Sequence, residues 1–274
     1  MVRNFFAAVT FILMATQASA GTNAAVSALT DAMRLPEILD IMREEGIDYG
    51  DELAMDMFPD RAGDRWRAKV TKIYDADRMS DIAIATMADE LGDADVAAMT
   101  AFFTGELGKR IVGLEISARR ALMDEAIEEA SKEHVAQMFE DGDERISLLE
   151  DFANANDLLD SNVAGALNSN FAFYTGLADG GALPDTMTES EMLRDVWSQE
   201  EDIRADTEEW LFSFLAMAYQ PLSDEELIQY IEFSTTAEGK ALNQSLFVGF
   251  DAMFIEISRG LGFAAAGMLA GEDI

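Results

Sequence analysis

His134 is the only histidine of the chain, which contains no cysteine. Hydrolysis by a Ser–His–acid or Cys–His group needs a histidine held beside a nucleophile, and zinc sites need three or four ligands that usually include His or Cys. His134 lies in a charged stretch, residues 128–138, with no Gly-x-Ser-x-Gly sequence before it. We therefore expect an exposed histidine, no catalytic residue, no metal site and no cofactor.

Carboxylates are the other groups that could do chemistry, because the chain holds 53 Asp and Glu residues against 19 Lys and Arg. Glycoside hydrolysis uses two carboxyl groups at a fixed separation, but no local pattern selects a pair here. Residues 141–145 begin like a calcium-binding loop, yet Arg145 stands at the fifth position, where that loop needs an oxygen ligand. Enzymatic activity is disfavoured but stays open.

The net charge of −34 also limits the partners of the protein. A surface of this charge repels the phosphates of nucleic acids, so nucleic-acid binding is not expected. Most of the acidic residues are expected on solvated helix faces. Basic residues are scarce after residue 146, where only four remain, and Lys240 is one of them.

The elements that would position these groups are predicted to be helices. Apolar residues recur every three or four positions, as at Met192, Val196 and Ile203, which is the spacing of a helix buried on one face. The four prolines, at positions 36, 59, 184 and 221, lie where helices should begin or end. Capping boxes are predicted at 188–191, 223–226 and 235–238. The predicted fold is all-α, with aromatic residues such as Trp210 and Phe247 in its core.

An internal repeat links two of the predicted helix boundaries. Residues 91–111 align with residues 222–242 without a gap. Each copy carries an aromatic residue, a threonine and a Gly-Lys pair at matching positions. These are Phe102, Thr104, Gly108 and Lys109 in the first copy and Phe233, Thr235, Gly239 and Lys240 in the second.

Each residue type in this motif has a structural role that it commonly fills. The threonines are predicted to be N-caps, as is Asp93 for the preceding helix, and the phenylalanines to pack one helix end on the next. The glycines would allow two helices to approach closely. For Lys109 and Lys240, an ion pair with a neighbouring acid is the favoured role, and contact with an anion or ligand is the alternative.

A second alignment places residues 29–40 over residues 149–160, at an offset of 120 instead of 131. The second copy therefore needs about eleven additional residues, which would fit in the Gly- and Pro-containing loop at 179–187. We predict two tandem modules of about five helices each, over residues 22–145 and 146–272.

The repeated motif resembles the exported bacterial helical family catalogued as domain of unknown function 2059. The resemblance rests on residues 102–109, Phe-Phe-Thr-Gly-Glu-Leu-Gly-Lys, and on residues 233–240, Phe-Ser-Thr-Thr-Ala-Glu-Gly-Lys. That family usually has tyrosine after the first phenylalanine, where this chain has Phe103 and Ser234. The resemblance implies an α-helical periplasmic protein with two diverged copies of the domain, and it implies no activity.

The first twenty residues are predicted to be a signal peptide. Arg3 is followed by an apolar run, Phe5 to Met14, and residues 18–20, Ala-Ser-Ala, form a cleavage site before Gly21. The apolar stretch at 246–270 carries three charged residues, so no membrane span is expected after cleavage. The predicted location is the periplasm.

These expectations together predict a soluble periplasmic binding or interaction module without catalytic activity. Its site would be the concave surface between the modules, and its partner a periplasmic protein or peptide. The alternatives are a carboxylate-dependent hydrolase acting on cell-envelope material and a low-affinity cation-binding acidic protein.

Overall fold

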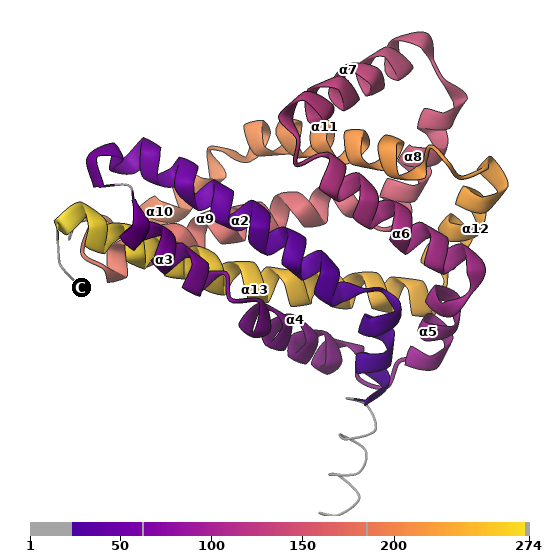
Figure 1. Cartoon of the computed structure of the whole chain (residues 1–274), viewed down its shortest axis with the longest axis horizontal. Coiled ribbons are helices and arrows are strands. Elements are labelled where there is room, and N and C mark those ends of the chain that lie inside the picture. Colours follow the sequence, from indigo (N-terminus) through magenta and orange to yellow (C-terminus); the bar gives the residue numbers. More distant parts are fainter. Residues whose placement is uncertain (1–23, 62, 185, 272–274) are drawn as a thin grey trace, which may run out of the picture.

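The computed structural model describes residues 24–61, 63–184 and 186–271, so the predicted signal peptide lies outside the described residues. Every regular element in these ranges is helical, which confirms the all-α prediction (Figure 1). A first helix covers residues 24–32. It is followed by α2 (Leu35–Met57), η1 (Pro59–Arg61), α3 (Asp64–Ile73), α4 (Ala76–Leu91), α5 (Val96–Thr104), α6 (Glu106–Ala121), α7 (Glu125–Asp141), α8 (Glu144–Ala155), α9 (Leu158–Asp179), α10 (Glu189–Trp197), α11 (Glu200–Tyr219), α12 (Asp224–Thr235) and α13 (Ala237–Ala270).

Two of the three predicted capping boxes are present. Thr188 caps α10 with Glu191, and Ser223 caps α12 with Glu226, each pair exchanging backbone and side-chain hydrogen bonds. The cap of α5 is Asp95, whose carboxylate accepts from the backbone N–H of Ala98. The prediction that Asp93 caps this helix was wrong. The helix begins at Val96, so the residue directly before it, Asp95, is the N-cap.

Helix α13 is the central helix of the molecule and packs against both α9 and α4 (Figure 1). Glycines bring the backbones together where α13 crosses α9. A Cβ on Gly262 would lie 2.1 Å from the carbonyl oxygen of Phe173, and one on Gly176 would lie 2.1 Å from that of Arg259. Helix α13 is long and apolar enough to cross a membrane by length and composition, and 39% of its most apolar stretch is buried against other helices.

The helices before α7 and the helices after it, which we call the two halves of the described chain, show the same order of helix pairs. In the first half α2 packs against α3, α4 and α6, and in the second α9 packs against α10, α11 and α13. The contacts between the halves are reciprocal. Helix α4 packs against α13 of the other half, and the corresponding α11 packs against α6. Each half thus contributes six helices rather than about five, with α7 between them.

The apolar core does not divide at the predicted boundary between residues 145 and 146. The largest cluster of buried residues joins residues 26–116 to Leu177 and residues 242–266. A second cluster joins Ile111 and Ala118 of α6 to α8, α11 and α12. The core is continuous across this boundary because helices of each half bury their apolar faces against helices of the other half.

The upstream alignment needs a different offset. Arg34 and Asp157 are the two non-glycine residues with positive φ in the described chain, at 54° and 51°, and they directly precede α2 and α9. They match at an offset of 123, so the alignment of 29–40 with 149–160 was wrong by three residues. The additional residues of the second half are also not confined to the predicted loop, because α11 has 20 residues where α4 has 16.

Candidate functional site

The two copies of the repeated motif form two helix corners of the same geometry. The N-cap of α6 is Gly105 (φ −66°, ψ 169°), and that of α13 is Thr236 (φ −68°, ψ 166°). Inside each corner the matched glycine touches the preceding helix. A Cβ on Gly108 would lie 2.3 Å from the carbonyl oxygen of Phe102, and a Cβ on Gly239 2.1 Å from that of Phe233. The glycines allow a sharp turn between consecutive helices.

The predicted caps Thr104 and Thr235 were wrong by one residue. Both are the last residues of their helices, and their hydroxyls donate to carbonyl oxygens of the turn before, at Thr100 for Thr104 and at Glu232 for Thr235. Thr236 is the residue whose hydroxyl caps α13, by accepting from the backbone N–H of Gly239. The capping box predicted at 235–238 is therefore absent. With Thr236 as the N-cap, the third position of α13 is Gly239, which has no side chain to complete the box.

Phe102 and Phe233 bring the two corners together. Their rings stack with centroids 3.9 Å apart and planes inclined by 8°. Tyr230 of α12 stacks on the other side of the aromatic group, 5.7 Å from the ring of Phe102. The predicted aromatic packing is thus between the two copies, and it joins α5 to α12.

Lys109 and Lys240 do not make the favoured ion pair. Both are exposed, and among the described residues neither has an acidic partner within 4.0 Å. Most arginines, in contrast, are paired. The expectation for the lysines was wrong. Next to Lys109, the residue that binds an acid across the helices is Arg110, which pairs with Glu226.

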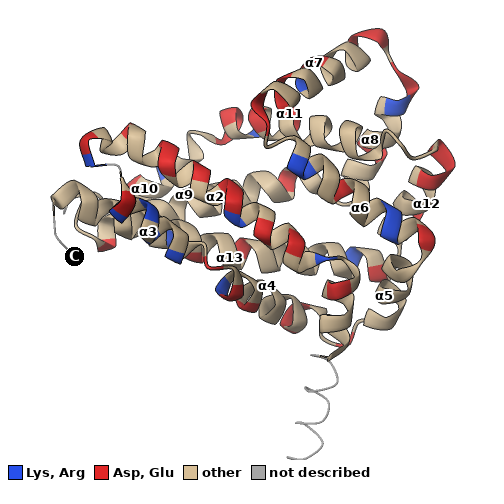
Figure 2. Cartoon of the chain, viewed as in Figure 1, with Lys and Arg blue, Asp and Glu red and all other residues tan. Residues whose placement is uncertain are grey.

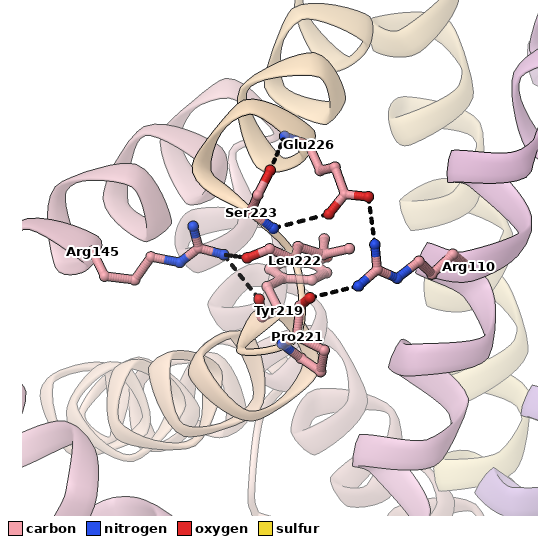
Figure 3. A network of polar contacts seen from close by, with 7 residues as sticks. All are labelled: Arg110, Arg145, Tyr219, Pro221, Leu222, Ser223 and Glu226. Atoms are coloured by element: carbon pink, nitrogen blue, oxygen red, sulfur yellow. Dashed lines mark hydrogen bonds and ion pairs between the residues drawn. The ribbon is translucent and has the colours of Figure 1, made fainter.

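Arg110 and Arg145 hold the turn between α11 and α12 from two sides (Figure 3). From α6, Arg110 pairs with Glu226 and donates to the carbonyl oxygen of Pro221 at 2.5 Å. From α8, Arg145 donates to the carbonyl oxygens of Tyr219 at 2.8 Å and Leu222 at 3.0 Å. Two charged groups from both halves fix the turn and therefore the ends of the helices that it joins.

This turn positions two tyrosines against a carboxylate in the interior. Tyr219 of α11 donates to Oε1 of Glu115 at 2.7 Å, and Tyr230 of α12 donates to the same oxygen at 3.3 Å. Burial raises the pKa of the Glu115 carboxyl from 4.5 to about 7, and the two hydrogen bonds lower it in part. Burial and the charge of Glu115 raise the pKa of both tyrosines well above its ordinary value, so both stay hydrogen-bond donors.

Glu115 lies at the inner end of a cleft between α6, α8, α9, α11 and α13, which we call the central cleft. The part that Glu115 lines, called the inner part, has a volume of about 280 Å³. The adjoining part, called the outer part, has a volume of about 520 Å³, and the two parts share lining residues. The shared residues are Met42, Arg119, Asn162, Trp210, Phe247 and Phe250. Helices of both halves form its walls.

Trp210 and Phe247 line the central cleft and are only partly buried, and neither belongs to any of the three buried clusters. The interpretation of these two residues as core was therefore wrong. Leu211 and Phe212, next to Trp210, are buried, and Leu211 also lines the inner part of the cleft. The aromatic sequence at 210–214 thus contributes to both a core and a cleft.

Arg119 is the one basic residue that lines the cleft among the described residues, and its charge is already engaged. It binds Glu45 of α2 through two hydrogen bonds, of 3.0 and 2.7 Å, and lies 5.9 Å from the ring centroid of Trp210. This pair joins α6 to α2 at the mouth of the cleft.

The other predictions about chemistry concern the surface. His134 is exposed, as predicted. In the calcium-like sequence, Asp143 caps α8 and Arg145 binds the α11–α12 turn, so both have structural roles. No group of three or more acidic or histidine side chains within the described residues could hold a metal ion.

The central cleft was missed because its polar residues carry no motif. Glu115 follows Ile111 by four residues and precedes Ala118 by three, both of which are buried, so the helical spacing already placed an acid beside the apolar face of α6. Tyr219 and Tyr230 come from other helices, and only the fold brings them to Glu115.

Comparison with known proteins supports the resemblance in the first half. Residues 77–137, from the first turn of α4 into α7, match the model of the bacterial family DUF2059, described as an uncharacterized protein conserved in bacteria. This range contains residues 102–109, whereas residues 222–242 lie outside it. No curated protein and no solved structure matches the chain. Over residues 77–137, this protein is thus similar to a bacterial family that has no described activity.

Proposed function

We propose that this protein is an exported, non-catalytic binding protein whose ligand occupies the central cleft. The observation that carries the proposal is the pair Trp210 and Phe247, two large aromatic side chains that face an open cleft instead of a core. Small-molecule sites are commonly clefts lined by apolar and aromatic side chains with a few polar groups that orient the ligand. Glu115, Asn162 and Asn243 are such polar groups here.

Binding is favoured over the hydrolase alternative by the acids of the cleft. A carboxylate-dependent hydrolase needs two acids near the scissile bond. Glu115 is the single acid that lines the inner part among the described residues. Asp251 lines the outer part and accepts a hydrogen bond from Asn168 at 3.0 Å. The alternative of a cation-binding acidic protein has no clustered acids to support it in the described chain.

We further infer that the chain arose by tandem duplication, with the periplasm as its location. The equal corner geometry, the reciprocal helix pairs and the matching glycines support the duplication. The n-region, apolar run and cleavage site of residues 1–20 support export. Both stand as proposals, and the ligand site does not depend on either.

A variant that fills the cleft tests the proposed function. Gly165 lines the outer part, and a Cβ there would meet no heavy atom closer than 3.9 Å, so a larger side chain can be built from α9 into the cleft. The neutral fluorescent probe N-phenyl-1-naphthylamine should bind the wild-type protein and should not bind Gly165→Phe. Phenylalanine has a higher helix propensity than glycine, by about half a kcal/mol, so the variant should stay folded.

The control is Gly113→Phe on α6, at a partly buried glycine that does not line the cleft and where an added Cβ has its nearest neighbour at 3.9 Å. It should bind the probe like the wild type. Equal probe binding by the Gly165 variant, with circular dichroism showing a folded chain, would contradict the proposal.

A further inference from the structure

One oxygen of Glu115 is open to the cleft. Oε1 accepts both tyrosine hydroxyls, whereas Oε2 has no hydrogen-bond partner among the described residues. No buried side-chain oxygen or nitrogen in the described chain lacks a partner, so Oε2 is not sealed inside protein. Because Glu115 lines the inner part of the cleft, Oε2 is a hydrogen-bond acceptor available to whatever enters it.

Among the described residues, no positively charged side chain forms an ion pair with Glu115. Arg119 follows it by four residues on α6, a spacing that often gives an ion pair, but Arg119 binds Glu45 instead. The charged and titratable groups around the cleft are Arg119 on α6, Glu45 on α2, Tyr219 on α11, Tyr230 on α12 and Asp251 on α13. Arg119 and Glu45 neutralise each other, so the remaining charge is negative.

Aromatic rings surround the carboxylate. Phe152 packs against Tyr219 with centroids 5.1 Å apart and against Tyr230 at 4.8 Å. Trp210 and Phe214, which also line the inner part of the cleft, stack at 5.4 Å. The faces of aromatic rings attract cations, most strongly where water is excluded, and this is how proteins commonly bind organic ammonium groups.

We propose that the ligand of the central cleft is an organic cation with an apolar body, and that Glu115 is its counter-ion. This inference rests on the proposed binding function and names the class of ligand. The cation would bind Oε2 of Glu115, and the apolar body would contact Trp210, Phe214 and Phe247. The net charge of −34, spread over outer helices such as α2, α7 and α12 (Figure 2), also attracts cations toward the protein.

The affinity should depend on pH because a cation binds ionised Glu115 more strongly. With a pKa of about 7, roughly a tenth of Glu115 is ionised at pH 6 and roughly nine tenths at pH 8. A ligand that stays a cation throughout this range should therefore bind about tenfold more tightly at pH 8 than at pH 6. A neutral ligand of the same shape should show no such increase.

Three small molecules with one shared ring separate charge from shape: the cation 2-phenylethylamine, the neutral 2-phenylethanol and the anion phenylacetate. Each is titrated against full-length mature protein carrying N-phenyl-1-naphthylamine, at pH 6 and pH 8. At pH 8 the cation should displace the probe at a concentration about tenfold lower than the alcohol, and phenylacetate should be the weakest.

Glu115→Gln should remove both the preference for the cation and its pH dependence while leaving the affinity for the alcohol within about twofold. Glu232→Gln is the matched control, because Glu232 is an exposed acid of α12 whose side chain has no partner in the described chain. It removes the same net charge and should leave the preference intact. If Glu115→Gln does not fold, the pH dependence of the wild type decides.

The outcomes separate the two proposals. Absence of probe binding by the wild type would overturn the proposed function itself. Probe binding with equal or better displacement by the alcohol or phenylacetate, or with no displacement by any of the three, would leave the binding function standing and overturn the cationic ligand.

Discussion

Burial raises the pKa of the Glu115 carboxyl group, and its ionisation therefore affects stability. The folded state holds the proton up to about pH 7, whereas the unfolded chain releases it near pH 4.5. The stabilisation from this group is fully present below pH 4.5 and is lost as the pH rises through 7. The loss amounts to as much as about 3 kcal/mol.

Glu115→Gln cannot ionise, so its stability relative to the wild type should increase between pH 4.5 and 8 by up to that amount. Urea unfolding of both proteins at several pH values measures the difference. The comparison cancels the pH dependence of the other carboxyl groups. A constant difference across this range would show that Glu115 titrates like an exposed acid.

The sequence predicted individual residues well where their role is local. Ser223 and Thr188 cap their helices as predicted, because a capping box is complete within four residues. Thr104 and Thr235 were misplaced by one position, since threonine is accepted both at a cap and in the last turn of a helix. Glu115 could not be recognised as a site, because its tyrosine partners are 104 and 115 residues away.

At the scale of elements, the crossing of α9 and α13 depends on glycine. Gly262→Ala would place a Cβ 2.1 Å from the backbone oxygen of Phe173, so the helices must separate, and the free energy of unfolding should fall by about 3 kcal/mol. Gly260→Ala, two residues away on the same helix, would meet only the side chain of Ile73 at 3.5 Å. It should be neutral or stabilising by up to about 1 kcal/mol.

Thermal unfolding of the two variants beside the wild type measures this contrast. Equal stabilities of the two variants would mean that α9 and α13 cross elsewhere. The small-residue composition of 264–270 predicted a closely packed helix. The partner of that helix was not predictable, because the spacing of its glycines does not identify the segment of the chain that packs against them.

The breaks before α2 and α9 were also not predictable. Left-handed backbone is usually adopted by glycine and occasionally by asparagine or aspartate, so Asp157 is an accepted residue there and Arg34 is the unusual one. The tertiary packing of the flanking helices overrides the local preference, so the alignment based on side-chain types took the wrong offset.

At the scale of the whole molecule, the proposed export predicts the N-terminus of the mature protein, independently of the fold. Protein recovered from the periplasmic fraction of a bacterial host should begin at Gly21, as mass spectrometry of its N-terminal peptide would reveal. Leu13→Arg, which interrupts the apolar run of the predicted signal peptide, should keep the full-length chain in the cytoplasm. A periplasmic chain that retains residues 1–20 would contradict cleavage after Ala20.

The order and type of the helices followed from the sequence, but the division into two modules did not carry over to the core. Periodicity identifies an apolar face without its partner. Here α4 and α13 cover each other across the halves, as do α6 and α11, and the sequence contains no signal for this exchange.

The reciprocal pairing has a consequence for the history of the chain. Two identical subunits would show the same pairing if a helix of each packed against the other subunit. An ancestor with one module would then have been stable only as a homodimer, at a concentration above its dissociation constant. Under the proposed duplication, joining the two genes would have made this encounter intramolecular and let each half diverge. Glu115 has no acidic counterpart in the second half, where the matching position holds Leu246.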